Sequence, residues 1–175
     1  GADVDRLAEI LQVRRIKFFH TVINFQNPSG ISYSESKRRL LAETLASYDT
    51  LVVEDDPYRE LRFEGRPSPS MRHWLGDRVI LLGSFSKIVA PGLRMGWVCA
   101  PRETLDKLVV AKQASDLHSN SFCQRMLHQY LVGQRLIERG KPLTTRVLVH
   151  PANVAAMRAR CRDGAELRFE FLDLL

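Results

Sequence analysis

Cysteine and long apolar runs are scarce in this sequence. The three cysteines, Cys99, Cys123 and Cys161, lie far apart without a CxxC pair, which favours reduced thiols and gives no metal-site or disulfide pattern. No run approaches the roughly 18 apolar residues of a membrane helix. The first residues have neither a basic nor an apolar segment, which excludes a signal peptide there. We therefore expect a cytoplasmic protein with no membrane span and no metal.

Acidic residues are too few to balance the basic ones, and the formal net charge is +6. Between residues 135 and 162 the basic side chains are opposed only by Glu138; they are Arg135, Arg139, Lys141, Arg146, Arg158, Arg160 and Arg162. Such a surface can bind nucleic acid, but a solvated helix face explains the same charge more simply. The sequence has no Cys/His finger, repeat or basic motif interleaved with aromatic residues to support the nucleic-acid interpretation.

Segments with helical and strand-like apolar patterns alternate along most of the chain. The predicted helices are residues 3–13, 34–48 and 102–130, and the predicted strands are residues 17–25, 50–54, 79–83 and 96–100. This alternation predicts an α/β fold with a mostly parallel sheet flanked by helices. The strands lack polar alternation, so we expect helices on both faces of the sheet.

Helix 34–48 shows most clearly how the helices are expected to pack. Ser34 is its predicted N-cap, as Asp3 is for helix 3–13. Its buried face is predicted to carry Leu40, Leu41, Leu45 and Tyr48.

Polar residues follow three of the predicted strands. Asn27 comes after the first, Asp55 after the second, and Ser84 and Lys87 after the third. In open parallel sheets, ligands bind beyond the carboxyl ends of the strands. The sequence therefore predicts a ligand site at that edge.

The run from Ser84 to Arg94 suits a phosphate and an amine nucleophile. Serine hydroxyls donate single hydrogen bonds, whereas the guanidinium of Arg94 can hold two phosphate oxygens at once. Lys87, in the same loop, is of the type that forms Schiff bases. Taken alone, Ser84-Phe85-Ser86-Lys87 is better explained as an ordinary surface loop.

The run Glu54-Asp55-Asp56-Pro57-Tyr58 is equally open when taken alone. Adjacent acids at a strand end are usually a solvated loop or a helix cap. A carboxylate against a pyridinium nitrogen would instead keep that ring protonated and electron-withdrawing. Tyr58 and Asn27 could each donate to a phenolic oxygen on the same ring.

Together, in this order, these motifs resemble the class I/II aminotransferases, pyridoxal-phosphate enzymes with the aspartate aminotransferase fold. The resemblance covers about residues 1–132 and is nearest to the α-aminoadipate and kynurenine aminotransferase branch. The matching runs are Phe25-Gln26-Asn27-Pro28-Ser29-Gly30, Glu54-Asp55-Asp56-Pro57-Tyr58, Ser84-Phe85-Ser86-Lys87 and Pro91-Gly92-Leu93-Arg94-Met95-Gly96-Trp97.

The resemblance implies a role for each matching residue. Lys87 would form the Schiff base and carry the proton between substrate and cofactor. Asp55 would hold the pyridine nitrogen, with Asp56 as its neighbour only. The other cofactor-binding residues would be Asn27 and Tyr58 at the ring oxygen, and Ser84, Ser86 and Arg94 at the phosphate. The family transfers an amino group between an amino acid and a 2-oxo acid, usually as a homodimer.

The sequence also departs from the family. Residues 1–134 match part of the pyridoxal-phosphate-binding large domain, beginning near its middle, and 135–175 are expected to be a divergent helical segment leading towards an absent small domain. Arg168 is interpreted as part of a strand entering that domain, not as the family's substrate-carboxylate arginine. We expect this segment alone to bind the cofactor weakly and not to transaminate.

Two alternatives to an aminotransferase remain open. Transcription regulators with a winged-helix module (GntR/MocR type) upstream of an aminotransferase-like effector domain share all four motifs, and nucleic-acid binding is expected only if such a module exists. A vestigial, noncatalytic protein is the other alternative. The intact Lys87, Asp55, Tyr58 and Arg94 argue against decay by point substitution.

Overall fold

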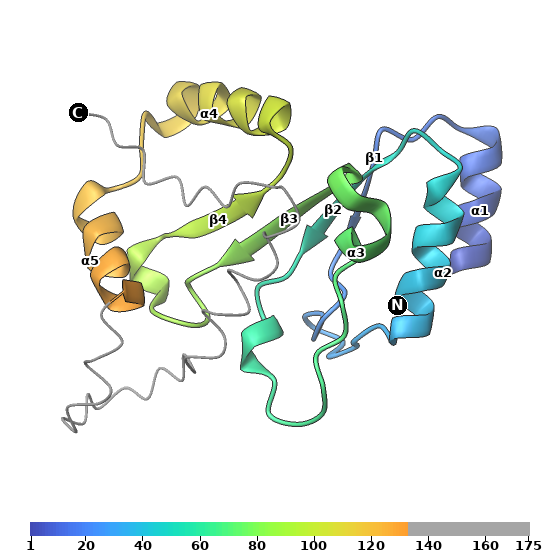
Figure 1. Ribbon diagram of the computed structural model, residues 1–175, viewed down its shortest axis with the longest axis horizontal. Coiled ribbons are helices and arrows are strands. Elements are labelled where there is room, and N and C mark those ends of the chain that lie inside the picture. Colours follow the sequence, from blue (N-terminus) through green and yellow to red (C-terminus); the bar gives the residue numbers. More distant parts are fainter. Residues whose placement is uncertain (133–175) are drawn as a thin grey trace. The chain divides into compact units, whose positions relative to one another are not determined.

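The structure, a computed structural model, describes residues 1–132. Residues 135–175, including Cys161 and Arg168, therefore lie outside the described part. The chain divides into two compact units, Gly1–Gly83 and a second that begins at Ser84. The elements are α1 (Val4–Val13), β1 (Phe18–Thr21), α2 (Glu35–Ala46), β2 (Leu51–Asp55), α3 (Arg72–Leu75), β3 (Val79–Ser84), β4 (Gly96–Cys99), α4 (Arg102–Asp116) and α5 (Ser121–Val132) (Figure 1).

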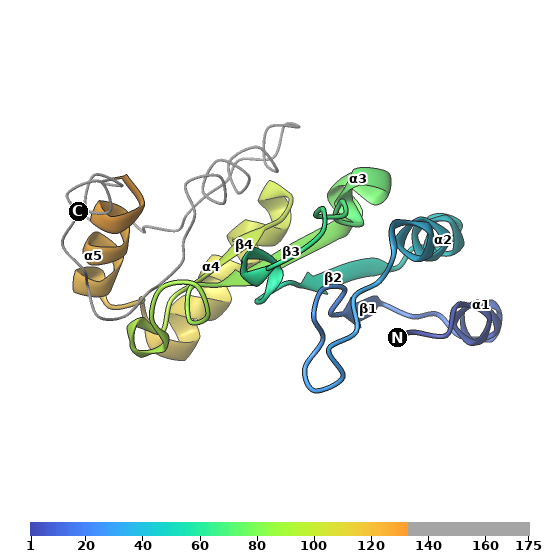
Figure 2. The same ribbon diagram turned by 90° about the horizontal axis from the view of Figure 1, so that it is seen from below.

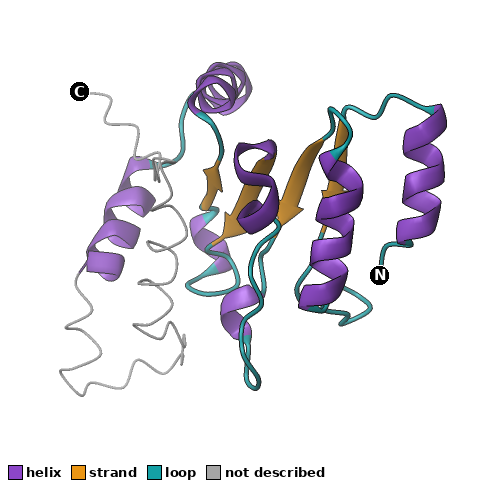
Figure 3. Cartoon of the chain, turned by 45° about the vertical axis from the view of Figure 1, so that its right-hand side comes forward, coloured by secondary structure: helices purple, strands orange, loops and turns teal. Residues whose placement is uncertain are grey.

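The strands form one sheet in the order β1-β2-β3-β4. β1 pairs with β2 in parallel, from Phe18 opposite Leu51 to Thr21 opposite Glu54. β2 pairs with β3 in parallel, from Val52 opposite Val79 to Asp55 opposite Leu82. A parallel pair needs a crossover connection, which α2 and α3 provide in the first unit (Figure 3). The predicted α/β fold with a mostly parallel sheet is confirmed.

Both predicted helix caps are present. The Asp3 carboxylate accepts a hydrogen bond from the Arg6 backbone N–H at 3.0 Å, and the Ser34 hydroxyl accepts one from the Lys37 N–H at 3.3 Å. These bonds satisfy N–H groups that the first turn of a helix leaves without partners. Local sequence therefore fixes where α1 and α2 begin.

The core of the first unit lies on one face of its strands. Alternate residues of a strand point to opposite faces, and one face carries the buried Val52 and Val79. The same core contains side chains of three helices and of the residue that precedes α3: Leu7, Leu11, Leu41, Ala42, Leu45, Leu75 and Met71. α2 and α3 lie on the same side of the strands in Figure 2.

In the first unit, the described helices leave part of the opposite face of the strands exposed, whereas the lack of polar alternation predicted helices on both faces. Phe18 is 60% exposed and Leu51 42% exposed, so no helix of the first unit's described residues covers them. The reason is the strand order. When strands follow one another in sequence and the crossovers keep one hand, the connecting helices fall on one face.

The buried face of α2 differs from the predicted one. Leu40 is 50% exposed, whereas Arg38 is fully buried together with Leu41, Ala42 and Leu45. Positions 38, 41, 42 and 45 have helical spacing, so the apolar stripe begins at an arginine. A search for apolar residues at helical spacing therefore does not identify Arg38 as buried.

Two other predicted elements have different bounds. The strand predicted at residues 17–25 ends at Thr21, because the backbone beyond it bonds to a neighbouring loop, as in the Tyr33 N–H to the Ile23 carbonyl at 2.9 Å. The region 102–130 is two helices, separated at Leu117, which has a positive φ of 67°. The Asn120 side chain then caps α5 by accepting from the Phe122 backbone N–H at 3.0 Å. In residues 1–132 no helix is long and apolar enough to cross a membrane.

Candidate active site

Asp55 is the last residue of β2 and points to the face opposite the core. The register places His20 opposite Val53, on the same face as Asp55. The Nε2 atom of His20 lies 3.9 Å from Oδ2 of Asp55, and the Asp55 side chain is 39% exposed. Asp55 therefore lies at the carboxyl end of a parallel strand, where the sequence predicted a ligand-binding acid.

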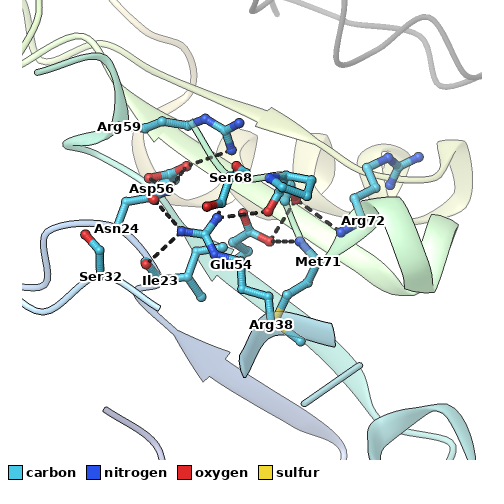
Figure 4. Close-up of polar contacts among 12 residues, drawn as sticks. Ile23, Asn24, Ser32, Arg38, Glu54, Asp56, Arg59, Ser68, Met71 and Arg72 are labelled. Carbon is cyan, nitrogen blue, oxygen red and sulfur yellow. Dashed lines mark hydrogen bonds and ion pairs between the residues drawn. The ribbon is translucent and has the colours of Figure 1, made fainter. Parts of the chain in front are cut away.

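Asp56, by contrast, turns into the protein. The Asn24 side-chain amide donates to both carboxylate oxygens of Asp56, each at 2.9 Å, and the two residues are 1% and 4% exposed (Figure 4). Arg59 Nη1 lies 3.6 Å from Asp56 Oδ2. The two adjacent acids thus have different surroundings, one half-buried and one inside a network of protein groups.

Arg38 is the centre of that network, and the sequence patterns did not predict it. Its guanidinium donates to the Asn24 side-chain oxygen at 2.6 Å and the Ile23 carbonyl at 3.2 Å. It also donates to the Pro69 carbonyl at 2.8 Å, which ties α2 to the segment before α3 (Figure 4). Burial lowers the pKa of the Arg38 guanidinium, an effect that nearby Glu54 opposes.

Glu54 lies on the core face, one residue before Asp55. Its Oε2 accepts from the Ser70 hydroxyl at 2.8 Å and the Met71 backbone N–H at 2.9 Å (Figure 4). Its Oε1 is buried and has no hydrogen-bond partner among residues 1–132. Burial raises the pKa of Glu54 to about 7, although both hydrogen bonds act against that rise.

The Asn27 loop is a closed turn further from its strand than predicted. β1 ends at Thr21, six positions before Asn27, so Asn27 does not directly follow the strand. The turn is held by the Gln26 N–H donating to the Ile31 carbonyl at 3.0 Å and by Gly30, whose φ of 70° suits a residue without Cβ. Asn27 is exposed, and its peptide bond to Pro28 is cis.

Tyr58 follows the strand end, as the sequence predicted. It immediately precedes the short 3-10 helix Arg59–Leu61, and its residue is half-buried. The first unit thus carries the three residues assigned to the cofactor ring: Asn27, Asp55 and Tyr58.

The second unit carries the four other predicted site residues: Ser84 at the end of β3, and Ser86, Lys87 and Arg94 in the loop that follows. The Phe85 backbone N–H donates to the Met95 carbonyl at 3.0 Å, which closes the loop between them. Phe85 and Met95 are buried, whereas Lys87 and Arg94 are exposed. The apolar side chains therefore anchor a loop that presents an amine and a guanidinium.

Two local features of this loop suit anion binding. The Ser84 hydroxyl accepts from the Ser86 backbone N–H at 3.1 Å, which holds two hydroxyl-bearing residues together. Arg94 has a left-handed backbone with φ of 54°, a conformation that costs free energy for a residue other than glycine. Such strain gathers at functional positions. No group of three or more metal-ligating side chains occurs in the described residues.

Comparison with known proteins identifies the family. The sequence model of the family described as "Aminotransferase class I and II" matches residues 1–173. The chain belongs to this family. Class I and II aminotransferases similar to it include aromatic-amino-acid aminotransferase 1 of Thermococcus litoralis, 42% identical over 139 residues, which are 76% of this chain and 33% of the relative. The 2-aminoadipate transaminase of Thermus thermophilus is 40% identical over 135 residues, 75% of this chain and 34% of the relative.

A solved aminotransferase has the same fold. The crystal structure of Pyrococcus horikoshii kynurenine aminotransferase, in complex with PMP, is 41% identical with a TM-score of 0.73. The match covers 79% of this chain and 36% of that one. The chain thus spans about a third of the length of the curated relatives it matches. The predicted resemblance to the aminoadipate and kynurenine branch is confirmed.

A relative of another kind bears on the alternative function. The uncharacterized HTH-type transcriptional regulator YcxD of Bacillus subtilis is 34% identical over 131 residues, 75% of this chain and 30% of the relative.

Proposed function

We propose that this chain is part of a pyridoxal-phosphate-dependent aminotransferase that transfers an amino group between an amino acid and a 2-oxo acid. Family membership supports the reaction class. The observation that carries the proposal is the loop closed by the Phe85 and Met95 backbones, which contains Ser86, Lys87 and Arg94 and follows Ser84 at the end of β3. An amine, a guanidinium and two hydroxyls are the groups needed to hold an aldehyde and a phosphate.

The donor set fits pyridoxal phosphate. When bound, this cofactor supplies an aldehyde that reacts with amines and a pyridinium ring that withdraws electrons. Ser84, Ser86 and Arg94 would hold the phosphate through hydroxyl and guanidinium donors. The hydrogen bond from the Ser86 N–H to the Ser84 hydroxyl and the left-handed backbone of Arg94 support that role, since both fix donors before a ligand arrives.

Asp55 would hold the ring nitrogen. A carboxylate pairs with a protonated ring nitrogen only if other protein groups do not already satisfy it. Asp55 is 39% exposed, whereas the carboxylate of Asp56 accepts from Asn24 and pairs with Arg59. This contrast supports Asp55 over Asp56. Tyr58 and Asn27 would donate to the ring oxygen.

Lys87 would have two tasks. Its Nζ would bind the cofactor covalently in the resting protein, as a Schiff base. Its amine would also carry the proton between the substrate α-carbon and the cofactor. The exposed position of Lys87 gives both substrate and cofactor access.

We expect the substrates and the oligomeric state of the whole protein to be those usual in the family. An amino acid and a 2-oxo acid would be the substrates, and the whole protein would be a homodimer. The relatives' names include aromatic amino acids, 2-aminoadipate and kynurenine, so a long or aromatic side chain is the substrate class to test first. The similarity to YcxD supports a second candidate, the effector domain of a regulator with an upstream DNA-binding module. The open reading frame upstream of residue 1 distinguishes the two.

Borohydride trapping tests the cofactor proposal. The 175-residue chain is incubated with pyridoxal phosphate, reduced and mapped by peptide mass. We expect label on Lys87, none at that peptide in Lys87→Ala, and undiminished label in the control Lys107→Ala, which removes an exposed lysine of α4. Label elsewhere with Lys87 unmodified would contradict the proposal. Tight binding with full transamination by this chain would contradict the expectation that it binds weakly and is inactive alone.

A further inference from the structure

The segments that carry the proposed ring-binding residues are joined at one buried contact. Asn24 is three residues before Asn27, and Asp56 lies between Asp55 and Tyr58. The Asn24 side-chain nitrogen donates to both oxygens of Asp56 at 2.9 Å, across 32 positions of sequence. The backbone pairing of β1 with β2 ends at Thr21 and Glu54. Beyond that point, the Asn24–Asp56 contact holds the two chain segments together.

The surroundings fix the orientation of the Asn24 amide. Its oxygen accepts from the Arg38 guanidinium at 2.6 Å, while its nitrogen faces the Asp56 carboxylate. An amide turned by half a revolution would place oxygen against a carboxylate and nitrogen against a cation. Only one orientation satisfies both neighbours.

Asp56, the other residue of the contact, is also held in place by neighbouring groups. The Asp56 backbone N–H donates to the Leu82 carbonyl of β3 at 3.0 Å, and its carboxylate lies 3.6 Å from Arg59 Nη1. A buried carboxylate is costly unless hydrogen bonds and opposite charge compensate it. Both are present, so this contact joins two well-anchored segments.

We infer that the Asn24–Asp56 contact positions Asn27 relative to Asp55 and Tyr58, so that Asn24 and Asp56 are positioning residues for cofactor binding. The inference rests on the proposed function. Neither residue needs to touch the cofactor. Their effect is to hold the Asn27 loop at a fixed place beside the end of β2 before a ligand arrives, which lowers the cost of ordering that loop on binding.

Charge exchange across the contact provides the test. Asn24→Asp places two carboxylates face to face and breaks the contact, whereas the double variant Asn24→Asp with Asp56→Asn restores one amide facing one carboxylate. Thr50→Val is the matched control. It removes a partly buried hydrogen bond just before the opposite end of β2, from the Thr50 hydroxyl to the Ile16 carbonyl at 2.9 Å across 34 positions.

Two measurements are made on the 175-residue chain under conditions where circular dichroism shows each variant folded. Without cofactor, we expect faster amide hydrogen exchange over residues 22–27 in Asn24→Asp but not in Thr50→Val. With cofactor, we expect Asn24→Asp to bind pyridoxal phosphate on the order of tenfold more weakly, about 1.4 kcal/mol. The double variant should recover most of that affinity, and Thr50→Val should keep it.

The outcomes separate the two proposals. Unchanged exchange over residues 22–27 in Asn24→Asp would overturn the positioning contact. Faster exchange with unchanged affinity, or an equal loss of affinity in Thr50→Val, would overturn its role in cofactor binding. An unmodified chain that binds no pyridoxal phosphate would instead overturn the proposed function, while the exchange measurement would still judge the contact.

Discussion

Glu54 is a single carboxylate whose charge the fold disfavours. One of its oxygens accepts two hydrogen bonds, from Ser70 and Met71, and the other is buried without a partner among the described residues. The pKa of Glu54 rises from 4.5 to about 7 because burial penalises the charged form. The folded chain therefore holds a proton at Glu54 that the unfolded chain releases in mildly acidic solution.

This difference predicts a pH dependence of stability. A raised pKa stabilises the fold fully below about pH 4.5, and that stabilisation is lost as the pH rises to about 7. The loss is roughly 3 kcal/mol at most. Glu54→Gln mimics the protonated form, so its free energy of unfolding should equal that of the unmodified chain near pH 4 and exceed it near pH 8. Urea titrations at both pH values measure this, and parallel pH profiles for the two proteins would contradict it.

Among the elements, α2 connects the most parts of the first unit to one another. It is the crossover between β1 and β2, it buries Leu41 and Leu45 in the core, and through Arg38 it holds two loops. Its start is set by the Ser34 hydroxyl, which accepts from the Lys37 N–H. The beginning of the helix and the position of Arg38 are therefore linked, since only one turn separates them.

Removing the cap should weaken the whole unit modestly. Ser34→Ala leaves a backbone N–H of the first turn without a partner and should lower the free energy of unfolding by about 1 kcal/mol. Ser47→Ala, at the exposed C-terminal end of α2, serves as the control and should change it by much less. Chemical denaturation compares the two. Equal effects would show that the Ser34 hydroxyl contributes little as a cap.

At the scale of the whole chain, the uncovered face of the first unit's strands is the most consequential surface. Phe18 and Leu51 are opposite each other in the register and are both largely exposed. Adjacent exposed apolar side chains promote association between molecules. A single exposed side chain such as Phe63, in a loop, does not form such a patch.

We therefore expect the 175-residue chain to self-associate through this face. Phe18→Thr combined with Leu51→Thr should lower the average mass seen by sedimentation at a given concentration and change the free energy of unfolding by no more than about 0.5 kcal/mol. Phe63→Thr should leave the average mass unchanged. An equal reduction in average mass by Phe63→Thr would indicate nonspecific hydrophobic association and would contradict a specific role for the face that carries Phe18 and Leu51.

Sequence patterns predicted the parts of this molecule that depend on local chemistry. Strand and helix order, the caps at Asp3 and Ser34 and the place of Asp55 at a strand end follow from residue type and spacing. The roles of Arg38 and Asn24 were not predicted, because they depend on partners 14 to 32 positions away in the sequence. The one signal in the sequence that could have found Arg38 is its place in the apolar stripe of α2, and a search for apolar residues alone leaves it out. The roles of Lys87 and its loop stay predictions until cofactor binding is measured.

The strand order of the first unit also affects how its strands can pair during folding. Each of β2 and β3 pairs with the strand made just before it, and each intervening helix packs on the core already formed. No pairing within the first three strands waits for residues from the far end of the chain. Contacts of short sequence separation close quickly because little loop entropy is lost. These three strands can therefore pair in the order of the sequence, without waiting for the loop that contains Lys87.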